Sequence, residues 1–387
     1  MTRVAFTIIG GKTKWMGGIN YLKNLLYAIS KLEDRKISPV LFVGKKIDKK
    51  LLSEFEGLAE IKRDSLFDRY SLKWFIDIIL RDLFKINPLI NSLVKTHQIT
   101  VFSHSFVYGI DLRCISVNWM PDFQHIRLPH MFSKINIVVR SFRLKALAKH
   151  SNSIILSSHD ALKDLQHFAP RYSSKGSVIN FVSQTTAYEN RPVQYLYDKY
   201  KFQSKYYFLP NQFWAHKNHQ TAFEAILLAK QQQPDILLIC SGQMEDERNP
   251  GFITGIKKYI IDNKLEGNIF LLGLIPFNDV LLLMKHSVSI INPSFFEGWS
   301  STVEEAKSMN KSLILSNIPV HIEQAPDLGS FFNPAKAEEL SNLLIEKWND
   351  CILKLTDSDN IEKALILRTQ EFGKQYQSLI LKNLKII

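Results

Sequence analysis

Long apolar runs are missing from this sequence, because none approaches the 18 residues that indicate a membrane-spanning helix. Cysteine is scarce as well, with three residues in 387, and their wide spacing matches neither a disulfide framework nor a cysteine metal site. The first residues read as a strand with no small-residue cleavage site after them, so we expect no signal peptide. These absences favour a cytoplasmic protein with reduced thiols.

Acidic residues are missing from one stretch of the basic first half. No Asp or Glu lies between Asp122 and Asp160, where six Lys and Arg accumulate. Residues 1–190 hold 28 Lys and Arg against 15 Asp and Glu, whereas residues 191–387 hold 21 against 22. The net charge of +12 therefore belongs to the first half. Such an imbalance favours an anionic partner, which can be nucleic acid, an acidic membrane or a phosphorylated substrate.

Length and pattern predict two α/β domains. A chain of 387 residues exceeds one ordinary core, and 45% hydrophobic with 22% charged residues is typical of a globular protein. Short apolar runs alternate with helical patterns in both halves, which predicts two doubly wound parallel sheets. A stretch without periodicity at 180–192 is the expected linker.

The stretch from Asn292 to Ala306 carries the clearest chemical signal. The apolar run Val288–Ile291 predicts a buried strand, and a helix is expected to start near Ser300–Thr302. Free N–H groups at such a helix start, together with the helix dipole, favour an anion such as phosphate. The alternative is a capped helix that packs on its sheet, with a solvated acidic pair in its first turn.

Two carboxylates, Glu297 and Glu305, bracket this helix start with seven residues between them. With Pro293-Ser294, Gly298-Trp299 and the later Ser-Asn-Ile-Pro at 316–319, the stretch resembles the Glu-x7-Glu signature of the retaining family-four glycosyltransferases, and among them the bacterial surface-polysaccharide mannosyltransferases. The resemblance covers most of the chain and is strongest at 206–330 and 117–160. It implies the GT-B fold, in which two Rossmann-like domains face a cleft.

The resemblance also implies a division of labour along the chain. Residues 1–185 would bind the acceptor, residues 186–365 would bind the nucleotide sugar, and a helix at 366–387 would cross back to the first domain. Glu297 would hold the donor sugar and Glu305 the ribose hydroxyls. The donor diphosphate would meet Lys217, which matches the family's lysine, while the family's arginine is absent and Asn211 stands near its place. The remaining expected donor contacts are Gly298, Trp299, Ser300, Ser301 and Thr302.

Two candidate sites fall in the first half. The glycine pair Gly17–Gly18 stands at a helix entry after the first strand, where the backbone can approach a ligand closely, and a flexible turn is the alternative. The resemblance implies that Gly17 and Gly18 contact the donor, at its phosphate, or else the acceptor. The loop that contains His125 follows another strand, and an imidazole can hydrogen-bond a sugar hydroxyl. On its own His125 is a structural histidine; the resemblance implies a place near the donor sugar or the acceptor.

Two amphipathic helices are expected in the basic half. Residues 70–85 either pack on the sheet or lie in a membrane interface. Residues 135–149 predict a basic helix with Ile135, Val138, Val139, Phe142 and Ala146 facing inward.

The function implied is transfer of a hexose, with retention, from a nucleotide sugar to a glycan or polyprenyl-diphosphate-linked acceptor in bacterial polysaccharide or lipopolysaccharide synthesis. Neither a metal nor a cofactor is expected, because Lys217 and the helix dipole can stabilise the leaving phosphate. We expect a cytoplasmic protein that is peripheral on the anionic inner face of the cell membrane. A GT-B epimerase or other non-transferase enzyme remains an alternative. So does a basic nucleic-acid-binding protein, although no aromatic-basic interleaving predicts a specific nucleic-acid site.

Overall fold

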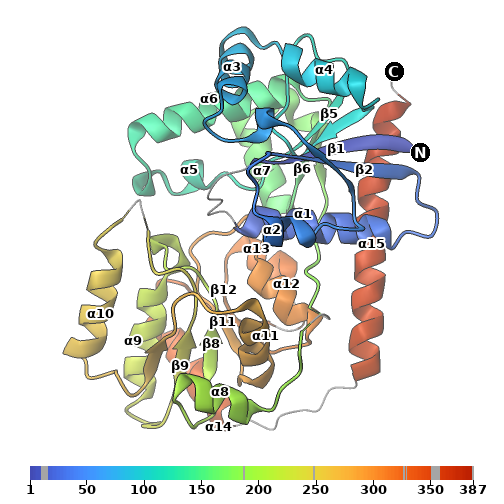
Figure 1. The fold of residues 1–387 in the computed structure, drawn as a ribbon. Coiled ribbons are helices and arrows are strands. Elements are labelled where there is room, and N and C mark those ends of the chain that lie inside the picture. The colour runs from blue at the N-terminus through green and yellow to red at the C-terminus, as the bar shows by residue number, and fades with distance from the viewer. Residues whose placement is uncertain are drawn as a thin grey trace. The chain divides into compact units, whose positions relative to one another are not determined.

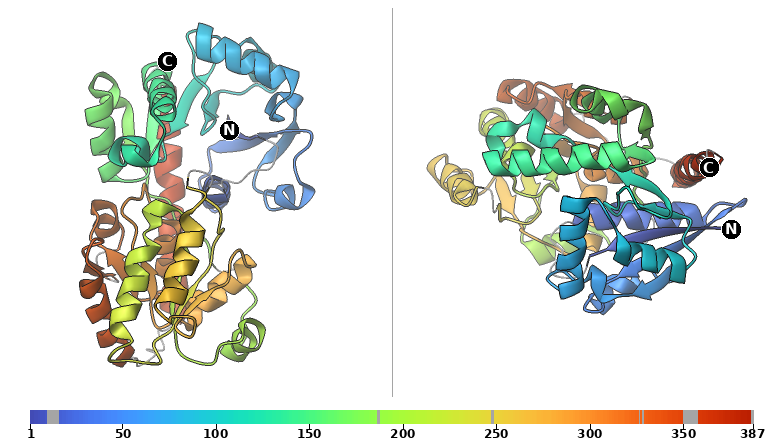
Figure 2. Two further views of the ribbon diagram at one scale, coloured as in Figure 1. Left: turned by 90° about the vertical axis from the view of Figure 1, so that its left-hand side faces the viewer. Right: turned by 90° about the horizontal axis from the view of Figure 1, so that it is seen from above.

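The structure is a computed structural model that describes residues 1–9, 16–185, 188–246, 249–325, 327, 329–349 and 358–385. The described residues form two compact units. The first unit comprises Met1–Ile126, Ser133–Ser183 and Ile366–Ile387, and the second comprises Arg127–Phe132 and Gln184–Leu365. The elements of both units can be followed in Figures 1 and 2.

The first unit contains a seven-stranded parallel sheet in the order β3-β2-β1-β4-β5-β6-β7. Its strands are β1 (Thr2–Ile8), β2 (Ile37–Val43), β3 (Glu60–Arg63), β4 (Val101–Ser103), β5 (Ile115–Trp119), β6 (Ser153–Leu156) and β7 (Gly176–Val178). Its helices are α1 (Met16–Ser30), α2 (Lys49–Ser53), η1 (Ser65–Phe67), α3 (Leu72–Ile79), η2 (Leu80–Phe84), α4 (Pro88–Thr96), α5 (Gln124–Arg127), α6 (Lys134–His150), α7 (His159–Phe168) and η4 (Pro170–Lys175).

The second unit contains a six-stranded parallel sheet in the order β10-β9-β8-β11-β12-β13. Its strands are β8 (Tyr207–Leu209), β9 (Leu238–Cys240), β10 (Ile269–Leu271), β11 (Ile290–Asn292), β12 (Leu313–Ser316) and β13 (Gly329–Phe332). Its helices are η3 (Pro129–Met131), α8 (Val193–Tyr200), η5 (Ala215–Lys217), α9 (His219–Ala229), α10 (Phe252–Asp262), α11 (Phe277–His286), α12 (Ser301–Ser308), α13 (Pro319–Gln324) and α14 (Ala337–Asn349); α15 (Ser358–Leu384) begins here and continues into the first unit.

Parallel pairing explains why the inner strands are buried along their whole length. Helices cover both faces of such a sheet, so β6, β8 and β12 are buried at every position. Serine side chains then start several helices, since Ser133 and Ser158 accept hydrogen bonds from backbone N–H groups in the first turns of α6 and α7. The predicted architecture of two doubly wound parallel sheets is confirmed.

The last helix completes the core of the first unit. Phe372, Tyr376 and Ile380 of α15 are buried there, and the Tyr376 hydroxyl donates to Ser103 Oγ at 2.8 Å. The side-chain amide of Gln377 makes two hydrogen bonds to the segment between α1 and β2. It accepts from the backbone N–H of Lys36 and donates to the backbone carbonyl of Asp34. The red helix in Figure 1 lies beside α1 and β2 accordingly.

One orientation predicted from the sequence is wrong. The helix expected at 135–149 exists as α6, but Ile135, Val138, Val139 and Phe142 are 76%, 66%, 42% and 55% exposed. Only Ala146 of the predicted inner face is buried, where it packs with Leu144, Leu147 and Ala148 at the C-terminal end of the helix. The sheet covers only that end of α6, so the apolar stripe of the N-terminal half faces solvent.

The helix predicted at 70–85 is also partly exposed on its apolar side. It is α3 followed directly by the π-helical turn η2, where Leu72, Phe75, Ile79 and Leu83 are 76%, 47%, 51% and 72% exposed. Neither α3 nor any other described helix combines the length and the apolar character that crossing a membrane requires.

Candidate functional site

The loops after β8 and β11 meet at the switch point of the second sheet. These two strands are neighbours at the place where the strand order reverses, and ligands bind outside the carboxyl ends of strands at such points. The loop after β8 carries Asn211 and Lys217, and the loop after β11 carries Glu297. The backbone N–H of Phe295 donates to the carbonyl of His216 at 2.9 Å and ties the loops together.

Lys217 and Glu297 form an ion pair across these loops. Lys217 Nζ lies 2.6 Å from Glu297 Oε1, and the two side chains are 14% and 9% exposed. The same carboxylate oxygen accepts a hydrogen bond from Ser294 Oγ at 2.8 Å. Burial by itself raises the pKa of Glu297, but the charge and hydrogen bond of Lys217, together with the nearby His321 and His216, outweigh it and bring that pKa to about 2. Glu297 is therefore ionised at neutral pH.

A chain of amides and hydroxyls lies beneath the ion pair. Asn211 Nδ2 donates to Asn292 Oδ1 at 2.9 Å, and Asn292 Nδ2 donates to Ser300 Oγ at 2.9 Å. Thr302 Oγ1 donates to Asn211 Oδ1 at 3.2 Å. All four residues are buried, so the network fixes the ends of β8 and β11 against the start of α12.

The start of α12 presents free donors, as predicted. Ser300 is the cap residue, because its side chain accepts from the N–H of Val303, and its own N–H donates to Gln324 Oε1 at 3.1 Å. No described residue accepts a hydrogen bond from the backbone N–H of Ser301 or Thr302. These two donors and the positive end of the helix dipole are available to an anion.

The other expected donor contacts surround this helix start. Gly298 and Trp299 are partly exposed in the loop before it, and Lys307 Nζ lies 5.9 Å from the centre of the Trp299 ring. Glu305 lies one turn inside α12 and is 8% exposed. No described side chain pairs with its carboxylate, and burial raises the pKa of Glu305 to about 8. Hydroxyl groups of a ligand would satisfy this carboxyl.

A glycine brings a third loop close to the site. Gly242 follows β9 with φ +144°, and a Cβ at this position would lie 2.4 Å from the carbonyl oxygen of Asn211. Only a residue without a side chain permits this approach. The backbone after β9 therefore borders the same switch point.

Some supporting residues were not predicted from the sequence. Ser294 donates a hydrogen bond to Glu297. The side-chain amide of Gln324, in α13, bonds both the backbone N–H and the backbone carbonyl of Ser300. Ser294 stands inside the quoted motif, where its spacing from Glu297 is a usable signal. Gln324 is 24 residues from Ser300, and no pattern in the sequence joins them.

The remaining predicted residues belong to the first unit. The helix α1 begins at Met16, about one turn earlier than expected, so Gly17 and Gly18 lie in its first turn. The rest of the predicted glycine loop, residues 10–15, lies outside the described residues. His125 is buried in α5, and neither of its ring nitrogens has a partner among the described residues. Burial first, and then the charge of Arg140, lowers the pKa of His125, so its ring is neutral at pH 7.

A cavity of about 340 Å³ lies at the switch point of the first sheet. Gly18 lines it after β1, His104 after β4 and Trp119 at the end of β5. Arg81 and Arg143 also line the cavity, but both are paired with carboxylates: Arg81 with Asp77 and Asp82, and Arg143 with Asp82. The charges around this cavity are therefore balanced, and its wall offers polar groups to a ligand.

No group of metal-ligating side chains occurs among the described residues. The one Asp-x-Asp triplet of the sequence, at 357–359, begins outside them.

Comparison with known proteins finds a family similarity for much of the second unit and a fold similarity for the whole chain. Residues 199–356 match the model of the family described as Glycosyl transferases group 1. No curated protein matches the chain by sequence.

Solved structures match over almost the whole chain. HepE of Anabaena in complex with UDP has 16% identity and a TM-score of 0.69, over 99% of this chain and 100% of its own. A glycosyltransferase of Rickettsia africae has 15% identity and a TM-score of 0.63, over 100% and 97%. The lipopolysaccharide outer core galactosyltransferase WaaB has 14% identity and a TM-score of 0.60, over 98% and 99%. These similarities confirm the GT-B fold that the sequence predicted.

Proposed function

We propose that this protein transfers a hexose, with retention, from a nucleotide sugar to a glycan or polyprenyl-diphosphate-linked acceptor. The observation that carries the proposal is the Lys217–Glu297 pair beside the two free N–H groups of α12. A cation and a helix start stabilise a diphosphate, and the carboxylates beside them can hold hydroxyls. The family match of residues 199–356 supports the same reading.

In the proposed complex the donor lies along the switch point of the second sheet. Lys217 and the N–H groups of Ser301 and Thr302 bind the diphosphate and stabilise the charge of the leaving nucleoside diphosphate. Glu305 accepts from the ribose, and Glu297, held ionised by Lys217, accepts from hydroxyls of the sugar. Gly298, Trp299 and Ser300 shape the wall, and Asn211 aligns the two loops. Among similar structures, HepE is solved with UDP-glucose, so uridine nucleotides are the first donors to test.

The acceptor is assigned to the basic first unit. The 340 Å³ cavity has Arg81, Arg143 and Gly18 in its walls, and a phosphorylated or diphosphate-linked acceptor would bind there in place of the aspartates that now pair with the arginines. Gly17 offers backbone close to a ligand. His125 is fully buried and does not line this cavity, so its contact with a sugar stays a prediction. A leaving phosphate that takes the acceptor proton would give retention without a protein base, and no metal is needed in this scheme.

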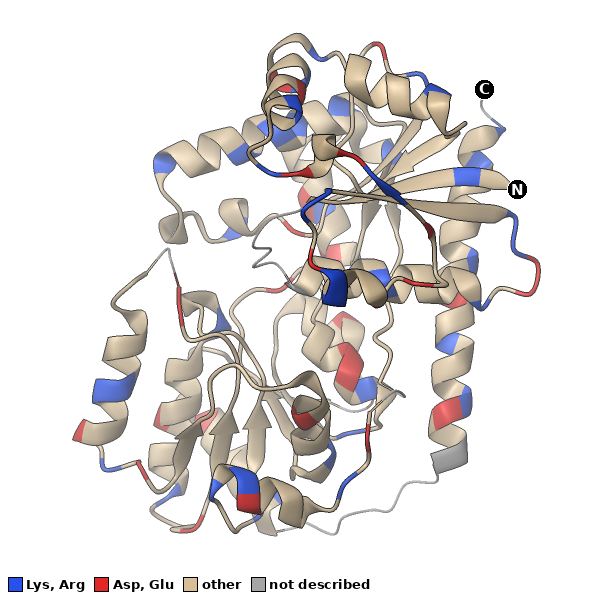
Figure 3. Ribbon diagram, viewed as in Figure 1, with Lys and Arg blue, Asp and Glu red and all other residues tan. Residues whose placement is uncertain are grey.

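A membrane partner is proposed for the exposed apolar side of α3, η2 and α6. We call these exposed residues (Leu72, Ile79, Leu83, Ile135 and Val138) the apolar face; Lys and Arg occur along all three helices, and α6 carries no acidic residue (Figure 3). Apolar side chains flanked by cations suit an anionic interface. We therefore place the protein at the cytoplasmic face of the cell membrane, where lipid-linked glycans of the polysaccharide or lipopolysaccharide type are assembled.

The test is release of nucleoside diphosphate from a panel of nucleotide sugars, with and without membrane extract of the encoding organism. We expect acceptor-dependent release from one donor, loss of it in Glu297→Ala, and a product whose anomeric configuration equals that of the donor. A donor consumed at the same rate without acceptor would instead support an epimerase or hydrolase. An inverted product would refute retention alone.

A further inference from the structure

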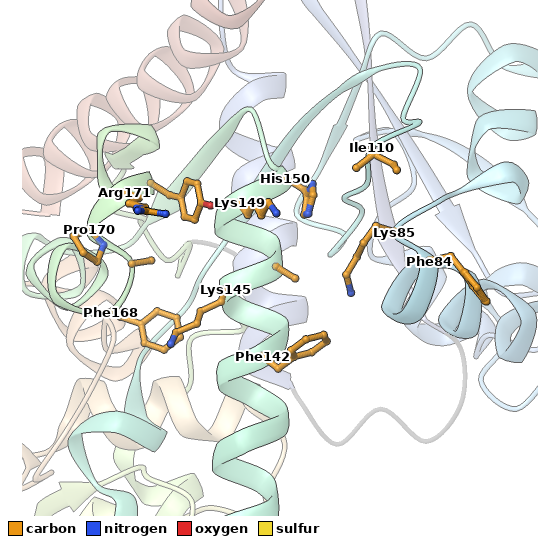
Figure 4. A pocket seen from close by; sticks show the side chains of 13 residues that line it. Phe84, Lys85, Ile110, Phe142, Lys145, Lys149, His150, Phe168, Pro170 and Arg171 are labelled. Atoms are coloured by element: carbon orange, nitrogen blue, oxygen red, sulfur yellow. The ribbon is translucent and has the colours of Figure 1, made fainter.

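A second hollow of the first unit is not used by the proposed reaction. It is a groove of about 700 Å³ along the C-terminal half of α6. Figure 4 shows Phe84, Lys85 and Ile110 on one side of that helix and Phe168, Pro170 and Arg171 on the other. Lys145, Lys149 and His150 of α6 lie between them.

The groove lies at the opposite edge of the sheet from the acceptor cavity. His150 ends α6 just before β6, Ile110 precedes β5, and Arg171 lies in η4 just before β7. Segments that lead into parallel strands lie at their amino-terminal edge, whereas Gly18 and His104 follow strands at the carboxyl edge. The groove is therefore separate from the acceptor cavity.

The charge of the groove is positive. Its lining contains Lys85, Lys145, Lys149, His150 and Arg171 and no carboxylate. Within the described part of the chain, Lys145, Lys149 and Arg171 form no ion pair and are exposed. Three cations held near one another without counter-charge attract an anion.

The negative end of the helix dipole, at the C-terminus of α6, would repel an anion, but the positive charge of Lys175 compensates for it. Its Nζ donates to the carbonyls of Ala148, Lys149 and Ser151 at 3.2, 2.8 and 2.8 Å, the free acceptors at the negative end of the helix dipole. The pKa of His150 is lowered by burial and then by Lys149, Lys85 and Lys175. The surroundings of His150 are thus electropositive although a helix ends there.

Aromatic rings flank the cations. Lys85 Nζ lies 4.7 Å from the centre of the Phe142 ring and Lys145 Nζ 5.4 Å from that of Phe168. Phe84 and Phe142 are 61% and 55% exposed, and they continue the apolar face of η2 and α6. The groove combines an anion site with an open apolar flank, which matches a phosphate joined to a hydrocarbon chain.

We propose that this groove binds the phosphate head group of an anionic glycerophospholipid while its acyl chain lies against Phe84 and Phe142. The lipid is a membrane component and not the acceptor, because the groove lies at the amino-terminal edge of the sheet. The inference deepens the membrane contact proposed above and is independent of the donor site.

The experiment titrates short-chain lipids into the full chain by calorimetry, below their micelle concentrations. Dihexanoyl phosphatidic acid is expected to bind at one site. Lys145→Gln with Lys149→Gln should weaken it by about 10-fold or more, since each cation near a lipid phosphate contributes about 1 kcal/mol. The matched control, Lys49→Gln with Lys50→Gln on exposed α2, removes the same charge elsewhere in the unit and should change affinity less than about 2-fold. Arg171→Gln provides a second groove variant.

Three results would overturn the proposal. One is equal weakening in the groove and control variants, which indicates diffuse attraction. Another is equal binding of dihexanoyl phosphatidylcholine, which indicates an apolar contact alone. The third is geranyl phosphate binding far more tightly than phosphatidic acid, which makes the groove an acceptor site. UDP titrated into the same variants separates the two hypotheses. UDP binding without lipid binding would refute only the lipid site in the groove, and lipid binding without UDP binding would refute only the donor site.

Discussion

Lys217 and Glu297 depend on each other in the absence of a ligand. Removing one partner of a buried ion pair leaves an uncompensated charge and costs about 3–5 kcal/mol. Lys217→Met should therefore lower the free energy of unfolding of the second unit by that order, and Lys217→Met with Glu297→Gln should recover most of it. Denaturant unfolding of the two variants checks this. A double variant as unstable as the single one would show that the unpaired charge of Glu297 is not what destabilises the Lys217→Met protein.

Glu305 should make stability depend on pH. Its pKa rises from an ordinary value near 4.5 in the unfolded chain to about 8 in the folded one, so the folded protein binds more protons between those values. Stability should then fall as pH rises from 4.5 to 8, by up to about 1.4 kcal/mol per pH unit.

Glu305→Gln should remove that slope and stabilise the ligand-free protein most at pH 8. Melting temperatures at pH 5, 6.5 and 8 provide the measurement. Parallel curves for wild type and variant would show that Glu305 is not the group that titrates.

The sequence indicated which residues gather at this candidate site, but it did not indicate their contacts. Lys217 and Glu297 could be singled out because each lies in a loop that follows a strand, and Glu305 because it lies one turn inside the next helix. The ion pair itself was not predicted, because its partners are 80 residues apart and meet only when β8 and β11 pair. Ser294 and Gln324 were missed for the same reason.

At the scale of elements, α6 shows the limit of periodicity. Apolar residues at 135, 138, 139 and 142 give the pattern of a core-facing helix, and a membrane-facing helix gives the same pattern. Whether the apolar side of α6 is buried or exposed depends on how much of the helix the sheet covers, and this in turn depends on strand length and register. The existence of α6 was predictable, and its exposed side was not.

The apolar face of α6 yields its own test. Ile135→Ser with Val138→Ser should reduce binding to anionic vesicles roughly 10-fold, because each serine has less apolar surface to bury in the membrane than the residue it replaces. Fold and donor binding should stay intact, since both residues are exposed. Ile261→Ser on α10 is the control, being exposed but in the second unit. Sedimentation with vesicles measures the effect, and unchanged binding in the double variant would remove this face from the membrane contact.

At the scale of the molecule, each sheet has its own switch point and each switch point has its own polar site. The first unit depends in addition on residues from the other end of the chain. Tyr376 is buried against Phe6 and His104, with ring centres 6.1 and 5.7 Å away.

Tyr376→Ala should destabilise the first unit by about 3–5 kcal/mol, and Tyr376→Phe, which removes only the bond to Ser103, by about 1 kcal/mol. Hydrogen exchange reports this locally: amides of β1 and β4 should exchange faster, while those of β8 and β11 should not. Equal acceleration in both sheets would show that the two units unfold together.

The account as a whole depends on a nucleotide site at Lys217 and the start of α12, and calorimetric titration of UDP, followed by GDP and ADP, into the full chain tests it most directly. We predict that one nucleoside diphosphate binds at a single site. Lys217→Met should weaken that binding at least about 10-fold, as expected for a charge-assisted phosphate contact. Lys257→Met, an exposed lysine of α10, should leave it unchanged. Absence of binding by all three nucleotides, or equal affinity in both variants, would contradict the account.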